Sequence, residues 1–81
     1  MIQKIRPDMN IGESIKKYRM KKPKMTQNET VLELSLRGIE MSKSTYAKIE
    51  TNRMNIKVSE LKALSKIFDC EIGDFFEDLE D

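Results

Sequence analysis

The segment from Thr26 to Glu50 contains two start signals for helices, separated by one stop signal. Thr26 opens the sequence "TQNE", in which the threonine can cap the backbone amide of Glu29 while Glu29 reaches back to the threonine. Gly38 ends this helix, and Ser42 is a good N-cap residue for a second helix that runs to about Glu50. The segment is therefore predicted to form two short helices joined by a turn.

The rest of the chain shows a related pattern, with apolar residues three or four positions apart and no convincing strand-like alternation. A first helix is expected to start near Asn10 and to stop at Pro23, and a short fifth helix is expected from Gly73 to Leu79. The expected apolar stripes are Ile11, Ile15 and Tyr18; Val31 and Leu34, with Leu36 as a further candidate; Tyr46 and Ile49; Val58, Leu61, Leu64 and Phe68; and Phe75 with Phe76. The predicted fold class is all-α, a compact domain of five helices.

Composition excludes several classes of function. A chain of 81 residues forms one small domain, and with no histidine and a single cysteine it can assemble neither a zinc-ligand set nor a disulfide. Cys70 lies in an apolar context that indicates core, and the carboxylates of Glu77 and Asp78 are expected to be solvated. We therefore expect no enzyme, no metal and no cofactor.

No segment of the sequence indicates a membrane protein or an exported one. The apolar runs are far shorter than the roughly 20 residues that a membrane span needs, and the N-terminus lacks the apolar core of a signal peptide. A soluble, cytoplasmic protein is expected.

Charge is distributed unevenly along the chain. All 15 Lys and Arg lie within residues 1 to 66, together with 7 of the 14 Asp and Glu, so this part carries a net charge of +8. Lysines also fill the outer face of the first expected helix, including Lys16 and Lys17. The last 15 residues carry the other 7 acids and no base. One end of the molecule could meet a polyanion, whereas the other would repel it.

A helical wheel divides the helix from Ser42 to Glu50 into two sides. Tyr46 and Ile49 form an apolar side, joined by Met41 just before the helix. The opposite side spans about 140° and is called here the polar arc: Lys43, Ser44, Ala47 and Lys48. Its small residues would allow the helix to enter a major groove, and its lysine and serine side chains could donate to base edges or phosphates. The alternative is the ordinary solvated face of a surface helix.

The order and spacing of these segments resemble the Xre-type, phage repressor and Cro-like helix-turn-helix proteins over residues 10 to 77. The matching pieces are "IGESIKKYR", "TQ", "SKSTYAKIE", "NR" and "VSELKALSKIFDCEIGDFF". The resemblance implies a repressor-like domain in residues 10 to 81, with a helix-turn-helix in helices 2 and 3. Residues 1 to 9 would then form a flexible N-terminal arm.

The resemblance also implies roles for individual residues. Base edges would be read by Lys43, Ser44 and Lys48. The DNA backbone would be contacted by Gln27, Thr45, Thr51, Asn52 and Arg53. Glu50 would pair with Arg19 of the first helix. Structural alternatives stay open: Gln27 could only brace the neighbouring helix, Asn52 could only serve a left-handed turn, and Arg53 could be a solvated charge.

Four departures from the family pattern accompany this resemblance. The segment between "TQ" and "SKST" is about five residues longer than usual, and "KKPK" lengthens the first loop by one residue. Thr30 stands where a leucine is usual, and Asn52 replaces a frequent glycine.

The function expected from the sequence is a sequence-specific, double-stranded DNA-binding transcriptional regulator, and specifically a repressor. The alternative is an antitoxin or antirepressor-like module that uses the same fold to bind a protein. The acidic C-terminal region is the expected interface, either for a homodimer or for such a partner, through Phe75, Phe76 and Leu79.

Overall fold

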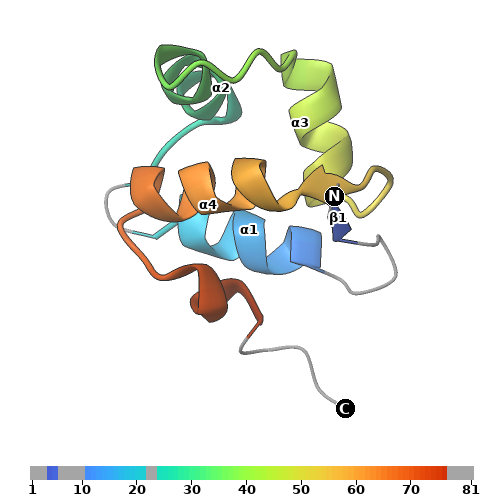
Figure 1. The fold of residues 1–81 in the computed structure, drawn as a ribbon, viewed down its shortest axis with the longest axis vertical. Coiled ribbons are helices and arrows are strands. Elements are labelled where there is room, and N and C mark those ends of the chain that lie inside the picture. The colour runs from blue at the N-terminus through green and yellow to red at the C-terminus, as the bar shows by residue number, and fades with distance from the viewer. Residues whose placement is uncertain (1–3, 6–10, 22–23, 77–81) are drawn as a thin grey trace.

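The computed structural model describes residues 4–5, 11–21 and 24–76, and in this part the chain is mostly helical (Figure 1). It contains four α-helices: α1 (Ile11–Arg19), α2 (Gln27–Leu36), α3 (Lys43–Glu50) and α4 (Val58–Ile67). A 3-10 helix, η2 (Ile72–Phe76), follows α4, and β1 (Lys4–Ile5) pairs with β2 (Ile56–Lys57).

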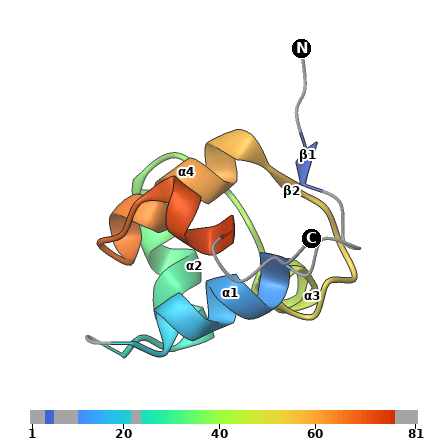
Figure 2. The same cartoon turned by 90° about the horizontal axis from the view of Figure 1, so that it is seen from below.

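The helices enclose one core. Helix α3 packs against both α1 and α2, and α2 also packs against α4. The short η2 contacts α1 and α4 and covers the core from below, as Figures 1 and 2 show. The buried apolar side chains come from every helix and from β2: Ile11, Ile15, Leu34, Tyr46, Ile49, Ile56, Leu61, Leu64 and Phe75.

The caps predicted for α2 and α3 are confirmed. Thr26 Oγ1 accepts from the Glu29 amide at 3.0 Å, and Glu29 Oε1 accepts from the Thr26 amide at 2.8 Å. Ser42 Oγ accepts from the Thr45 amide at 3.0 Å. Gly38, after α2, has a φ of +86°, which explains why a residue without Cβ stands there. These caps fix where the two helices begin and how the chain turns between them.

The fifth expected helix and the expected absence of strands need correction. The segment after α4 forms a single short 3-10 helix within the described residues, and Leu79 lies outside them. The strands β1 and β2 form an antiparallel pair in which Lys4 faces Lys57 and Ile5 faces Ile56. Strands of two residues leave no alternation for a sequence pattern to detect.

Part of the expected N-terminal arm thus lies in β1. The other residues of that arm, together with Asn10 and Pro23, lie outside the described part of the chain, so the division at residue 10 stays a prediction.

Two expectations about apolar residues need correction. Leu36 is 72% exposed, because it follows Leu34 by two residues and therefore points about 200° away from that buried side chain. Phe75 was expected at an interface but is fully buried, and its ring packs edge-on against Tyr18 and Phe68, with centroids 5.6 and 6.5 Å away. Phe75 is therefore a core residue.

Thr30, at the position where a leucine is usual, is also fully buried. Its hydroxyl donates to the Thr26 carbonyl oxygen at 2.9 Å, so the polar group is satisfied within α2.

Gly12 allows α1 to approach the end of α3 closely. A Cβ at this position would lie 2.3 Å from the Ile49 carbonyl oxygen and 2.6 Å from that of Glu50. Because both neighbours are backbone atoms, α1 could not carry a larger residue here without moving away from α3. This contact holds α1 beside the helix that carries the polar arc.

Candidate nucleic-acid interface

The two sides of α3 are separated in the structure as the helical wheel predicts. Tyr46 and Ile49 are buried in the core, whereas Lys43, Ser44 and Lys48 are exposed. Ala47, between the two lysines, is half-buried and keeps the centre of the polar arc low. The arc is therefore a basic surface on a helix whose other side is anchored.

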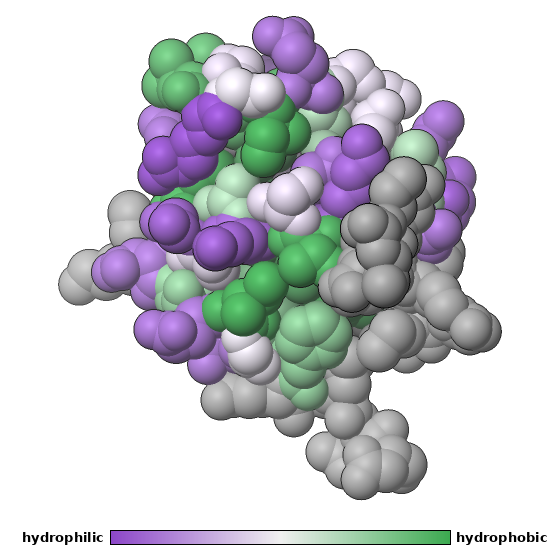
Figure 3. Space-filling view, viewed as in Figure 1, coloured by the Kyte–Doolittle hydropathy of each residue, from purple (hydrophilic) through white to green (hydrophobic). Residues whose placement is uncertain are grey.

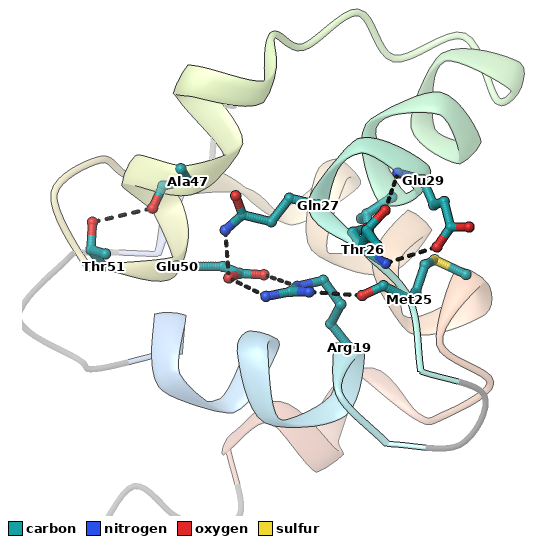
Figure 4. A network of polar contacts seen from close by, with 9 residues as sticks. Arg19, Met25, Thr26, Gln27, Glu29, Ala47, Glu50 and Thr51 are labelled. Carbon is teal, nitrogen blue, oxygen red and sulfur yellow. Dashed lines mark hydrogen bonds and ion pairs between the residues drawn. The ribbon is translucent and has the colours of Figure 1, made fainter.

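A buried polar network fixes the C-terminal end of α3 to two other elements (Figure 4). Arg19 of α1 donates to Glu50 of α3 through Nε at 2.6 Å and through Nη2 at 3.1 Å. Arg19 Nη1 donates to the Met25 carbonyl oxygen at 2.7 Å, and Gln27 Nε2 at the start of α2 donates to Glu50 Oε1 at 3.0 Å. The ion pair predicted between Arg19 and Glu50 is thus confirmed, with side chains only 9% and 1% exposed.

The network contains one cation and one anion, so its net charge is zero. Burial opposes ionisation of Glu50, yet the hydrogen bonds that it accepts from Arg19 and Gln27 hold its pKa below the usual range. The bond to Glu50 raises the pKa of Arg19, against the effect of burial. Both groups are therefore ionised at neutral pH.

Tyr46 adds a buried hydroxyl beside this pair. Burial, followed by the neighbouring Glu50 carboxylate, raises its pKa. Within the described residues this hydroxyl makes no hydrogen bond of good geometry. It stays a neutral phenol and leaves the charge of the network unchanged.

Gln27 and Asn52 both have the structural roles that the sequence left open as alternatives. Gln27 braces α3 through Glu50, as described above. Asn52 has a φ of +61°, so it forms the left-handed turn after α3, and its Oδ1 accepts from the Gly12 amide at 2.9 Å. Asn52 thereby also caps the first turn of α1. Contacts of either residue with DNA stay predictions.

The other residues predicted to contact the DNA backbone lie at the two ends of α3. Thr45 is half-buried in the first turn, where its hydroxyl accepts from Ser42 Oγ at 3.0 Å. Thr51, at the C-terminal end, shares its hydroxyl between the carbonyl oxygens of Ala47 and Lys48, each at 3.2 Å. The exposed Arg53 donates from Nε to Thr51 Oγ1 at 3.1 Å.

A cleft of about 420 Å³ lies between α1, the start of α2 and the end of α3, and it is called here the α1–α3 cleft. It brings together four of the predicted backbone contacts: Gln27, Thr51, Asn52 and Arg53. It also contains two residues of α1 to which the sequence assigned no part in DNA binding, Glu13 and Lys16. The lysine-rich face of this helix was the available signal, but the pattern could not show which lysine turns toward α3.

The side chains around α3 offer charge and hydrogen-bonding groups for recognition. Among the described residues, no three side chains suited to binding a metal ion gather in one place. Cys70 is a poor nucleophile, because burial and then the nearby acidic residue Asp74 raise the pKa of its thiol to about 11. No helix in the described ranges is long and apolar enough to cross a membrane.

Comparison with known families agrees with this geometry. Residues 15–75 match the helix-turn-helix family HTH_3, which covers most of the chain. The chain therefore belongs to the Xre/Cro-like helix-turn-helix family, a family of DNA-binding regulators. No curated protein and no solved structure gives a significant match.

Proposed function

We propose that the protein is a sequence-specific regulator of transcription that binds double-stranded DNA and acts as a repressor. In this proposal α2 and α3 form the helix-turn-helix, and α3 enters the major groove. The observation that carries it is the exposed polar arc on a helix whose other side is fixed by a buried network.

The residues divide into two groups by their place around α3. Lys43, Ser44 and Lys48 project from the arc and are proposed to read base edges, where lysine and serine can donate to guanine O6 and N7. Backbone contacts are assigned to residues at the ends of α2 and α3: Gln27, Thr45, Thr51, Asn52 and Arg53. Such contacts set the register of the helix in the groove but carry no sequence information themselves.

Repression would follow from occlusion of a promoter, without any chemical step. Two-fold dimers of such proteins read half-sites about 34 Å apart, one turn of DNA. Of the residues proposed for a homodimer through the C-terminal region, Phe75 belongs to the core and Phe76 is half-buried. Leu79 lies outside the described residues.

The second candidate is an antitoxin or antirepressor-like module that binds another protein. It is supported by the exposed pair Leu32 and Leu36 on the outer side of α2, which are 59% and 72% exposed. Figure 3 shows hydrophobic surface at the upper left, over α2. Apolar surface of this kind can mark a protein contact, although single exposed leucines are common.

The proposed function is tested by selecting bound duplexes from a random library and then titrating the selected duplex and a scrambled one. Selection of a defined sequence, bound at least about a thousandfold more tightly than the scrambled duplex, would support specific regulation. Equal, weak binding to both duplexes, together with a stable complex with a protein only, would favour the second candidate.

A further inference from the structure

The α1–α3 cleft lies directly beyond the polar arc. Ala47 belongs to the arc and also lines the cleft, and Thr51, one turn further along the chain, lines it as well. The two features therefore form one continuous surface. A ligand that binds along the polar arc of α3 would therefore also lie over the cleft.

The position of the cleft fits the edge of a major groove. Thr51 lies seven residues after Ser44, which corresponds to about 10 Å along a helix. Thr51 lies about 8 Å along the helix from the middle of the arc, whereas half the width of the major groove is about 6 Å, so Thr51 lies at the groove edge, where the phosphates run. A phosphate of one strand would thus arrive at the cleft when the arc lies centred in the groove.

The charges that face the cleft favour an anion. Arg19 and Glu50 neutralise one another at its floor through the ion pair of 2.6 Å. The groups that remain are the cations of Lys16 and Arg53 and the carboxylate of Glu13. Lys16 comes from α1, whereas Arg53 comes from the turn after α3, so the two cations belong to different elements around the cleft.

Arg53 is already held in place for such a contact. Its Nε donates to Thr51 Oγ1 at 3.1 Å, and that hydroxyl is itself anchored on the last turn of α3. This bond connects the Arg53 side chain to the end of α3, beside the cleft.

We propose that the α1–α3 cleft is the binding site of one DNA backbone phosphate. In this proposal Lys16 of α1 is a DNA-contact residue that shares this phosphate with Arg53. Glu13 opposes the phosphate and keeps the binding weaker than the two cations alone would make it. This inference rests on the proposed function, since it assigns a further contact to the same DNA-binding surface.

The test compares four proteins on the selected duplex at several salt concentrations: the wild type, Lys16→Ala, Arg53→Ala and the double variant. One neutralised phosphate contributes about 0.9 to the slope of log affinity against log salt, which corresponds to about 15-fold in affinity at 0.05 M salt and about 5-fold at 0.15 M. If the two cations share a phosphate, the double variant loses this amount once, and each single variant loses less.

Two outcomes would overturn the inference. A double variant that equals Arg53→Ala alone would show that Lys16 makes no contact. A double variant whose slope of log affinity against log salt falls by about 1.8 would show that the two cations neutralise two separate phosphates instead of sharing one. If the wild type itself bound no duplex at any salt concentration, the proposed function would fail together with the inference, so the two failures are distinguishable.

Glu13→Gln supplies a test of opposite sign. Removing this carboxylate should raise the affinity about two- to fivefold at low salt, a gain that a destabilised protein cannot produce.

The matched controls are Lys62→Ala on α4 and Glu71→Gln before η2, both exposed and outside the cleft lining; each should change the affinity less than its counterpart in the cleft. Equal effects at the control and cleft positions would indicate that the affinity responds to net charge alone, and would overturn the proposed phosphate site. Lys16→Gln in the Arg53→Ala background repeats the key comparison if alanine affects folding, which circular dichroism monitors.

Discussion

Replacing Arg19 with methionine removes the cation that faces the buried carboxylate of Glu50. The carboxylate is 1% exposed and accepts two hydrogen bonds from Arg19, so the variant leaves it with the Gln27 bond described above. Breaking such a buried pair costs about 3 to 5 kcal/mol, whereas an exposed pair contributes about 0 to 1 kcal/mol. A domain of this length has a total stability of roughly 4 to 12 kcal/mol, so Arg19→Met should lose a large part of it. Its Tm should fall by at least about 12 °C.

The loss should also depend on pH. The pKa of Glu50 is lowered in the folded wild type, so the pair stabilises the protein above the usual glutamate pKa of about 4.3, and this contribution is lost as the pH falls through the folded pKa. In Arg19→Met the buried carboxylate can accept a proton in acid. The difference between the two proteins should therefore be large at pH 7 and smaller below about pH 4.

Urea unfolding of both proteins at pH 7 and pH 3 measures this difference. Lys62→Met, at an exposed position of α4, is the control for loss of a cation and should change stability by less than about 1 kcal/mol. The double variant Arg19→Met with Glu50→Gln should recover part of the loss, since no buried charge remains. A loss below about 1 kcal/mol at pH 7, or a loss independent of pH, would refute the reasoning.

Three further predictions concern packing, base reading and the acidic end of the chain. Gly12→Ala should lower the free energy of unfolding by about 3 kcal/mol or more, because the added Cβ would meet backbone oxygens of α3. Gly73→Ala is the tolerant control, since no atom lies within 4 Å of the added Cβ. Ser44→Ala and Lys48→Ala should each lower the preference for the selected duplex over a scrambled one by about 1 to 3 kcal/mol, while Arg53→Ala should weaken both duplexes similarly and make binding less dependent on salt. If the two arc variants left both affinities unchanged, the polar arc would be only a solvated surface. Removing the last five residues, which include four acids, should leave half-site affinity unchanged or raise it at low salt, and a large loss in a folded protein would contradict this.

The helices and their ends could be predicted because their signals are local. Thr26, Ser42 and Gly38 act through the backbone within a few residues, and the core side of α3 follows from helical spacing alone. The pairing of Arg19 with Glu50 could be expected only from the family resemblance. Nothing in the intervening sequence indicates that these two residues meet.

The features that were missed depend on which elements meet in space. Phe75 was expected in an apolar stripe, but its place in the core, and not at an interface, follows from the docking of η2 on α1 and α4. The role of Asn52 as a cap for α1 requires the approach of α1 that Gly12 permits. The α1–α3 cleft is built by three separate elements, and no single segment of sequence carries a signal for it.

The pairing of β1 with β2 has a consequence for the order in which the molecule assembles. In the unfolded chain, joining Ile5 to Ile56 would close a loop of about 50 residues, at an entropic cost of roughly 3 to 4 kcal/mol that a ladder of two residues cannot offset. Once α1 is docked beside α3, only the short link between Ile5 and Ile11 remains to be closed. The strands should therefore join the sheet after the helices have packed. Their amide protons should exchange with solvent through local opening, much faster than those in the middle of α4.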